Sequence, residues 1–455
     1  NRTTPRDAYH FARGGEIDFY QNPRKLAIPL DFTAVTEHAE FLGESILCSD
    51  PESDVYSTDM CTDMRNEKED PEVEHRTFVN ILLKVFKADR PVRPAEICGD
   101  DGLRCMDAGR KRWQAIQNVA DEFYVPGEFT TLIGYEWTGQ QGGNRHRNVI
   151  FRNNTVPATA WSMIEVSTVE ELWQKLDDEC LPPCEVLTIS HNSNQSKGTR
   201  FNGMNPDGSP FSKEQAAYRA SHEPLVEVMQ FKGNSECRLG FGTEDEFCSF
   251  ENYDLRPSCP LEAAPGSSLK CVVPCDENGK PEGCIWSRNY VRNALKMGLA
   301  IEEQVGANPY LLGLLGSTDT HNSNPGNTTE ENYQGNFGFL DAKAEDRLRL
   351  KLETGFKLLP RNSGALAAVW SEENTRESIF DALQRRETFG TSGTRLVLRF
   401  FGGWDFPSVL DKDIDLATLG YSQGVSMGAR LPIMPDDGAP RFLFQAAKAV
   451  DGRKL

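Results

Sequence analysis

Short apolar runs recur along the chain, and each is bounded by turn residues such as Gly, Pro, Asn and Asp. Runs of this length that are rich in β-branched and aromatic residues predict strands. We expect such strands at residues 26–36, 129–137, 147–152, 185–190, 225–231, 311–316 and 365–370. Because the runs are almost continuously apolar, each predicted strand is expected to be buried.

Helical patterns lie between these strands. We expect helices at residues 110–122, 169–178, 286–297 and at the strongly amphipathic stretch 375–387. Each of these stretches is bounded by residues that favour the start or the end of a helix. Strands that alternate with helices favour an α/β fold built on a largely parallel sheet.

Three segments interrupt this alternation. Residues 49–75 are acidic and polar, 196–220 are rich in Gly, Asn, Ser and Lys, and 237–284 carry half of the 12 cysteines. We interpret them as long loops inserted over one face of a barrel or sheet. After about residue 395 the strand-like pieces RLVLRFF and RFLFQAAK follow, so we expect a main domain at 1–395 and a β-rich C-terminal region at 396–455.

Composition and charge exclude some classes of partner. The chain has 455 residues, of which 38% are hydrophobic and 26% charged, as in ordinary globular proteins. Its 68 acidic and 49 basic residues give a net charge of −19, without a Lys/Arg cluster. We therefore expect no nucleic-acid partner, since such partners are bound through basic patches. No window approaches the roughly 18 apolar residues of a spanning helix, so we also expect no membrane span.

The cysteines bear on the compartment. They number 12 and lie mostly outside the apolar runs. A zinc site would require tight Cys-x-x-Cys pairs, which are absent, so we favour disulfides over zinc. Disulfides persist in oxidising compartments, and the sequence thus predicts an exported protein that is periplasmic or extracellular.

Candidate chemistry gathers where the predicted strands end. His38, His191 and His321 close or follow predicted strands, Glu136 ends another, and His146 opens a strand after a Gly-rich turn. In parallel α/β folds the carboxyl ends of the strands build the active site, because the strand fixes position while the loop lets the side chain reach a ligand.

The pair Asp319 and His321 strengthens this pattern. Residues two apart in an extended segment point to the same side, so both can share one metal ion. Carboxylate with imidazole is a ligand set for zinc, manganese or iron. The alternative is a set of histidines satisfied by hydrogen bonds in the core. Glu37, beside His38, is either a second ligand or an acid that orients a neighbour.

Several motifs carry a resemblance to a known family. They are TPRDAYHFARG, LDFTAVTEHAEFLGE, PGEFTTLIGYEWT, HRNVIFR, SHNSN, EPLVEVMQFKGNSE, GSTDTHNS and RRETFGTSGTR. In these the chain resembles the polymerase and histidinol phosphatase (PHP) superfamily, and more closely its domain-of-unknown-function family 3604. The resemblance implies a distorted (β/α)7 TIM-type barrel with two or three metal ions, and hydrolysis of phosphate esters. It implies the metal ligands His38, Glu136, His146, His191, Asp319 and His321.

The sequence departs from the family pattern in two places. The family usually has Asp where this chain has Glu37. The family also begins with a strand ending in His-x-His-Thr, a motif that normally supplies two ligands and that this sequence lacks. We expect a longer native protein that is truncated here at both ends.

The function predicted from these features is hydrolysis of a phosphomonoester or phosphodiester by metal-activated water. We assign His191, Asp319 and Glu37 to catalysis. The substrate is expected to be small and anionic, and its candidate contacts are Arg147, Asn192, Lys232 and Arg395. Two alternatives stay open: a metal hydrolase acting on an amide, lactone or sulfate ester, and a non-catalytic exported binding protein with a vestigial metal site.

Overall fold

The structure of the chain is a computed structural model. It describes residues 3–19, 22–66, 91–139, 144–205, 207–250, 273–331, 333, 335–338, 341, 344–349, 361–408, 414–433 and 438–449. Parts of three predicted segments lie outside the described residues, namely 67–75, 251–272 and 450–455, and with them Cys259 and Cys271.

The first half of the chain, up to residue 190, contributes the first four strands of the main sheet, β3 to β6, and several helices. Its elements are α1 (Pro5–Ala12), β1 (Ile17–Phe19), β2 (Asn22–Arg24), β3 (Phe32–Ala34), α2 (Leu42–Ser49), α3 (Asp59–Asn66), α5 (Ala95–Cys98), α6 (Leu103–Phe123), β4 (Thr130–Trp137), β5 (Arg147–Phe151), α7 (Val169–Glu179) and β6 (Val186–Ser190).

The second half completes this sheet and adds a smaller one. Its elements are η1 (Ser193–Gln195), α8 (Lys213–His222), β7 (Leu225–Gln230), β8 (Gly233–Asn234), η2 (Glu246–Ser249), η3 (Ser287–Asn289), α9 (Val291–Val305), β9 (Gly313–Gly316), α10 (Ala344–Arg349), β10 (Leu366–Val369), α11 (Arg376–Gln384), β11 (Thr388–Thr391), β12 (Val397–Gly403), α12 (Leu416–Gln423), β13 (Val425–Ser426) and β14 (Arg441–Ala447).

The fold is mixed α/β, and its main sheet curls into a half-barrel. The strand order is β3–β4–β5–β6–β7–β8, with β9 paired to β7. Three pairs are parallel, β3–β4, β6–β7 and β7–β9. Strand β5 runs antiparallel to β4 and to β6, so the expectation of a largely parallel sheet is wrong here. The reason lies in residues 138–146, which are too few for the crossover that a parallel pair requires.

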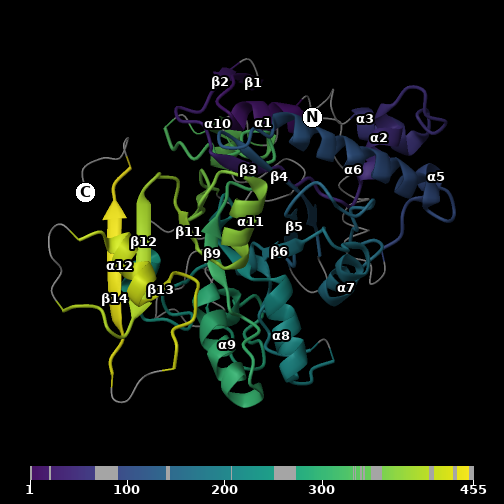
Figure 1. Cartoon of the computed structure of the whole chain (residues 1–455). Coiled ribbons are helices and arrows are strands. Elements are labelled where there is room, and N and C mark those ends of the chain that lie inside the picture. Colours follow the sequence, from purple (N-terminus) through teal and green to yellow (C-terminus); the bar gives the residue numbers. More distant parts are fainter. Residues whose placement is uncertain are drawn as a thin grey trace.

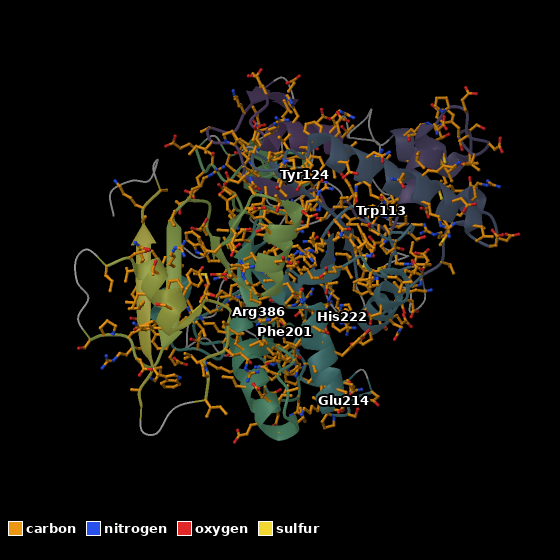
Figure 2. The ribbon with its side chains drawn as sticks, viewed as in Figure 1. Trp113, Tyr124, Phe201, Glu214, His222 and Arg386 are labelled. Atoms are coloured by element: carbon orange, nitrogen blue, oxygen red, sulfur yellow. A yellow bond between two sulfur atoms is a disulfide. The ribbon has the colours of Figure 1, made fainter. Side chains whose placement is uncertain are left out.

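Alternate residues of the strands feed two separate cores. On the outer face, Tyr135 and Phe151 pack against Trp113 of α6, which is labelled in Figure 2. On the inner face, Leu132 and Ile150 of the sheet belong to a second cluster. Helix α11 supplies Ile379, Phe380 and Leu383 to that cluster, so it fills one end of the half-barrel interior.

Buried Arg376, at the first turn of α11, fixes this helix to the sheet. Its Nε donates to the carbonyl of Thr131 at 2.6 Å, and its Nη1 donates to Asp121 at 2.5 Å. Thr375 caps the helix by accepting from the backbone N–H of Ser378. The helix position is therefore set by a cap, an ion pair and apolar contacts together.

The predicted helices correspond to α6, α7, α9 and α11, with shifted ends. Two of the predicted loops are wrong in part. Segment 196–220 contains most of α8. Its start is a capping box in which Ser212 and Gln215 satisfy each other's backbone N–H groups. Segment 49–75 likewise holds α3, so neither segment is a plain loop.

The described part of the C-terminal region contains mainly strands. Strands β13, β12 and β14 form a three-stranded antiparallel sheet on which α12 packs, and this sheet stands at the left in Figure 1. The boundary near residue 395 stays a prediction.

Disulfides staple the described loops, as the cysteine pattern predicted. Five are present, Cys48–Cys61, Cys98–Cys105, Cys180–Cys184, Cys237–Cys248 and Cys275–Cys284. Such bonds suit an extracellular protein. Among the described helices, none has the length and apolar character needed to cross a membrane.

We predict that Ile379→Ala lowers the free energy of unfolding by about 2–5 kcal/mol, because it leaves a cavity in the inner core. Denaturant titration followed by circular dichroism measures this change. The matched control is Glu377→Ala, on the exposed side of the same helix. An equal effect of both substitutions would contradict the inner core described for α11.

Candidate metal centre

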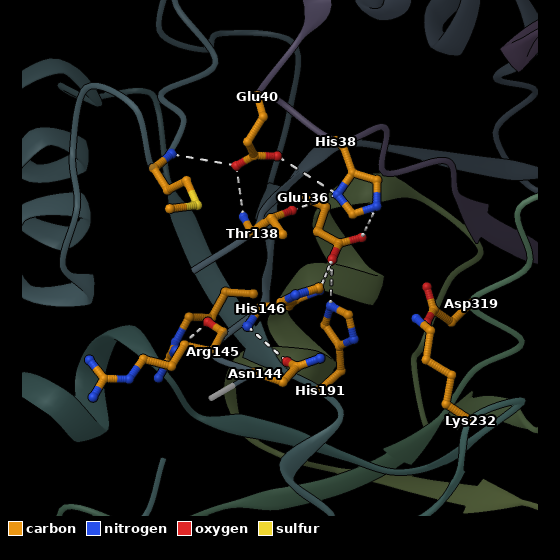
Figure 3. Close-up of polar contacts among 12 residues, drawn as sticks. His38, Glu40, Glu136, Thr138, Asn144, Arg145, His146, His191, Lys232 and Asp319 are labelled. Carbon is orange, nitrogen blue, oxygen red and sulfur yellow. Dashed lines mark hydrogen bonds and ion pairs between the residues drawn. The ribbon is translucent and has the colours of Figure 1, made fainter. Parts of the chain in front are cut away.

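The candidate site is built around Glu136, the penultimate residue of β4. Its carboxylate is buried, and Oε1 lies 2.6 Å from Nδ1 of His146 and 3.2 Å from Nε2 of His191. Nε2 of His38 lies 3.7 Å from Oε2 of the same carboxylate. We call these four residues the histidine–carboxylate cluster; Figure 3 shows the three imidazoles converging on Glu136.

Backbone pairing brings His38 to Glu136. The chain beyond β3 continues alongside β4, with a parallel bridge between these two residues. The N–H of Glu136 donates to the carbonyl of Glu37, and the N–H of Ala39 donates to the carbonyl of Glu136, both at 2.9 Å. Nδ1 of His38 is 2.5 Å from the hydroxyl of Thr138, which orients the ring.

His146 and His191 reach the carboxylate from neighbouring strands. His146 precedes β5 and His191 follows β6, and these strands are antiparallel neighbours. The N–H of His191 donates to the carbonyl of His146 at 3.4 Å. Strand β5 is antiparallel to β4 and β6. His146, which precedes β5, therefore lies at the same end of the sheet as Glu136 near the end of β4 and His191 after β6.

Asp319 and His321 lie beside the cluster, on the loop after β9. The His321 ring centroid is 5.8 Å from that of His38, and the ring stacks on Phe337. Asp319 accepts a hydrogen bond from Gln230 at 2.6 Å and forms an ion pair with Lys232, which Figure 3 shows opposite Glu136.

The two residues are not extended as predicted. Asp319 has a φ of 48°, in the left-handed region, and Nδ1 of His321 is 2.9 Å from the carbonyl oxygen of Asp319. Asp319 and His321 lie close together because the loop after β9 turns sharply at Asp319. Asn192, directly after His191, has a φ of 58°, so strained backbone occurs at two ends of the site.

A cavity of about 920 Å³ opens onto these groups. Its lining includes His38, Glu136, Asp319 and His321 together with Glu37. Deeper in the half-barrel the wall is apolar, with residues such as Leu132, Ile150, Ile189 and Leu315. The polar groups therefore lie at one end of an apolar chamber, where a ligand would meet them.

Electrostatics distinguish the charged groups of the site. Burial disfavours ionisation of Glu136, but the charges of His38 and His191 outweigh it and hold the pKa of Glu136 well below its usual range. Burial likewise opposes charge on Asp319, yet Lys232 lowers its pKa. Both carboxylates are therefore ionised, and both can bind a cation.

The histidines differ from one another in charge. Burial lowers the pKa of His146 to about 3 and that of His321 to about 4. Burial also disfavours the charged form of His191, but Glu136 outweighs it and raises the pKa of His191. Neutral imidazoles are the form that binds metals, and His146 and His321 are already in it.

None of the four predicted substrate contacts lines the cavity, and two of them, Arg147 and Arg395, bind other parts of the chain. Arg147 is buried on the outer face and pairs with Glu223 at 3.1 Å, since its neighbour Asn148 takes the inward position of β5. Arg395 donates to the carbonyls of Ile28 and Pro29 at 2.6 and 2.7 Å.

The other predicted residues lie close to the cluster. Asn192 is fully buried, and neither atom of its side-chain amide has a hydrogen-bond partner in the part of the chain that the structure describes. Lys232 contacts Asp319. Glu37 lines the cavity beside His38, and burial raises its pKa.

Sequence reasoning missed two carboxylates. Glu40 is buried, accepts from the N–H of Thr138 at 2.9 Å, and lies 3.7 Å from Nδ1 of His38. Glu227 is buried on β7 and lines the cavity. The signal for Glu227 was a charged residue inside the apolar run LVEVMQF.

Two groups of three residues in the described chain have the spacing of a metal site. The first is Glu136 with His146 and His191. The second is Glu44 with Cys98 and Cys105, but these cysteines form a disulfide with each other and present no thiolates. The donor set of the first group, carboxylate with imidazole, suits zinc, manganese or iron.

Fold and site together define a mixed α/β protein with a candidate metal centre at the strand ends of a half-barrel. The chain belongs to a family described as proteins of unknown function, DUF3604, whose model matches residues 1–455. A search of curated proteins and one of solved structures found no match.

We predict a pH effect on the metal-free protein. The folded state keeps His146 neutral down to a pKa of about 3, whereas the unfolded chain takes up this proton near 6.5. Stability therefore falls as the pH is lowered below about 6.5, by about 1.4 kcal/mol per pH unit for one proton. His146→Gln should remove this contribution.

Denaturant unfolding in chelator at pH 6.5, 6.0, 5.5 and 5.0 measures the slope. The matched control is His10→Gln, an exposed histidine of α1. If His146→Gln kept the wild-type slope, the neutral state of His146 would be contradicted.

Proposed function

We propose that this protein is an exported metal-dependent hydrolase of phosphoric esters, related to the PHP superfamily. Its half-barrel sheet would then correspond to part of the barrel of that superfamily. The observation that carries the proposal is the contact of buried Glu136 with His146 and His191 beside His38. Three imidazoles on one buried carboxylate form a donor set for divalent cations, and a core hydrogen-bond network would not leave Nδ1 of His191 without a partner in the described chain.

The charge in the cavity also favours cations. Glu136 and Glu227 are buried carboxylates there, Asp319 is a partly buried one, and Lys232 is the lysine in contact with Asp319. Buried charges are costly unless they are paired or coordinate metals. Two or three divalent ions would balance this excess, held by Glu136, His146 and His191, and by His38, Asp319 and His321.

When bound, such ions would supply a hydroxide near neutral pH and screen the charge on the phosphoryl oxygens. His191 and Asp319 would take catalytic roles by holding the ions in place, and Glu37 would orient the neighbouring His38. Asn192 would donate its side-chain N–H to a phosphoryl oxygen. Lys232, already bound to an anionic group, supplies positive charge at the same end of the cavity.

The proposed substrate is a small anionic ester. The charge arises from the phosphoryl group, which the polar end of the cavity would bind, while the apolar wall behind it contacts the rest of the molecule. The described disulfides support a location in the periplasm or outside the cell.

We predict that purified protein contains divalent metal and hydrolyses p-nitrophenyl phosphate or its diester. His191→Ala and Asp319→Asn should each lower kcat/KM at least about 100-fold, since even changes to groups behind a ligand cost 10–100-fold. Metal analysis and initial rates with zinc, manganese or iron measure both effects. His10→Ala on α1 is the control.

The outcomes separate the hypotheses. Undiminished hydrolysis in either variant would contradict the site. Turnover of sulfate esters, amides or lactones without turnover of phosphate esters would exclude the phosphoesterase. Metal-free protein without hydrolase activity would favour a binding protein.

We predict a second effect at Asn192. Asn192→Gly removes the amide and still accepts a φ of 58° without strain. A hydrogen bond to a charged group contributes about 1.5–3 kcal/mol, so kcat/KM should fall about 10- to 100-fold with metal content unchanged. The matched control is Lys197→Gly, an exposed residue with a φ of 53°. Equal rates in wild type and Asn192→Gly would remove Asn192 from the substrate contacts.

A further inference from the structure

Glu227 is a buried carboxyl group with no assigned role. Its side chain is 1% exposed and lines the cavity. One carboxylate oxygen accepts a hydrogen bond from the hydroxyl of Ser317. The other, Oε1, has no hydrogen-bond partner among the residues that the structure describes. A buried carboxylate oxygen without a partner is costly, and a bound cation would remove that cost.

Strand register places Glu227 between residues of the proposed centre. On one side, Ile189 pairs with Leu225 and Ser190 with Val226, so the next residue, His191, lies level with Glu227.

On the other side, Glu227 pairs with Leu315 of β9, and the same chain continues through Ser317 to Asp319. The charges of His191, Asp319 and Lys232 all act on Glu227. Register and these interactions therefore place Glu227 near an imidazole and a carboxylate.

Lys232 does not neutralise Glu227. Its ammonium contacts Asp319, and the structure gives no ion pair between Lys232 and Glu227 in the described chain. Lys232 is thus one basic group for the two carboxyl groups of Asp319 and Glu227. The carboxylate of Glu227 on β7, that of Asp319 after β9 and the imidazole of His191 after β6 would together form a ligand set for a hard or borderline divalent cation.

We propose that Glu227 is a metal ligand, which binds through Oε1 a divalent cation that Asp319 and His191 also approach. The inference rests on the proposed metal-dependent function and adds a ligand on β7 to that centre. Ser317 acts behind it as a positioning residue, because its hydroxyl holds the other oxygen of the carboxylate and so aims Oε1 into the cavity.

The test is Glu227→Gln, which keeps the shape and removes the charge. Wild type and variant are loaded with zinc or manganese and dialysed, and metal per chain is measured by elemental analysis. Affinity for the same ion is measured by competition with a chromophoric chelator. We expect the variant to lose about one equivalent, or to bind one ion more than about tenfold more weakly.

Two control variants accompany it. Glu214→Gln, on exposed α8 at the lower end of the molecule in Figure 2, should keep the full metal content. Ser317→Ala keeps the Glu227 charge and frees its orientation, so it should weaken the affinity less than Glu227→Gln does.

Thermal unfolding separates ligation from folding. In chelator, Glu227→Gln should melt at or above the wild-type temperature, because a buried charge beside Asp319 has been removed. With metal, its gain in melting temperature should be smaller than that of wild type. If Glu227→Gln does not fold, Glu227→Asp keeps the charge, withdraws the oxygen by one methylene, and should show the same loss of affinity.

Several results would overturn the inference. Wild-type metal content and affinity in Glu227→Gln would show that the carboxylate is no ligand, and the proposed function would stand. Wild type without bound metal would remove the proposed function itself. A lower melting temperature in chelator, with unchanged metal affinity, would make Glu227 a purely structural partner of Ser317.

Discussion

The buried carboxylate of Glu136 is the constraint on which the rest of this site depends. A carboxylate 4% exposed at the end of a strand requires positive or hydrogen-bonding partners, and here imidazoles from three other segments supply them. Those segments lie on both sides of β4 because β3 is its parallel neighbour and β5 its antiparallel one. The curled sheet therefore determines which histidines reach the carboxylate.

Along the inner face of the same sheet, the residues that form the apolar core lie apart from the residues of the candidate metal centre. Toward the start of β4, Leu132 packs with Ile150 and with α11, while Glu136 lies at the other end of the strand. Period-two alternation puts both residues on the inward side. An apolar floor and a charged rim thus arise from one strand. The floor keeps the charged groups in a region of low dielectric, where their interactions with a bound ion or anion are strong.

The sequence was sufficient for the parts of this structure that local patterns encode. Each predicted strand corresponds to an observed one, because an apolar run bounded by turn residues has few other uses. His38, Glu136, His146 and His191 could be predicted for the same reason, since each lies at the boundary of such a run. The antiparallel direction of β5 was missed, although segment 138–146 is too short in the sequence for the crossover that a parallel pair requires.

The sequence did not predict the roles of residues that depend on which face of the sheet their side chains lie on. Arg147 follows a histidine of the cluster directly, and adjacency in sequence suggested a shared role. In a strand, however, successive side chains face opposite sides, so Arg147 points to Glu223 while Asn148 lines the cavity. Glu227 is the converse case: a charge inside an apolar run was its signal in the sequence, and only pairing with two other strands places it near His191 and Asp319.

The outward position of Arg147 still serves the site. Its guanidinium donates to the carbonyl of Arg145 at 2.6 Å, and that of buried Arg200 donates to the carbonyl of His146 at 2.9 Å. Both arginines therefore hold the main chain of the turn that presents His146. Arg219 also joins this group, and Glu223 pairs with two of the three, so positive charge remains in excess behind β5.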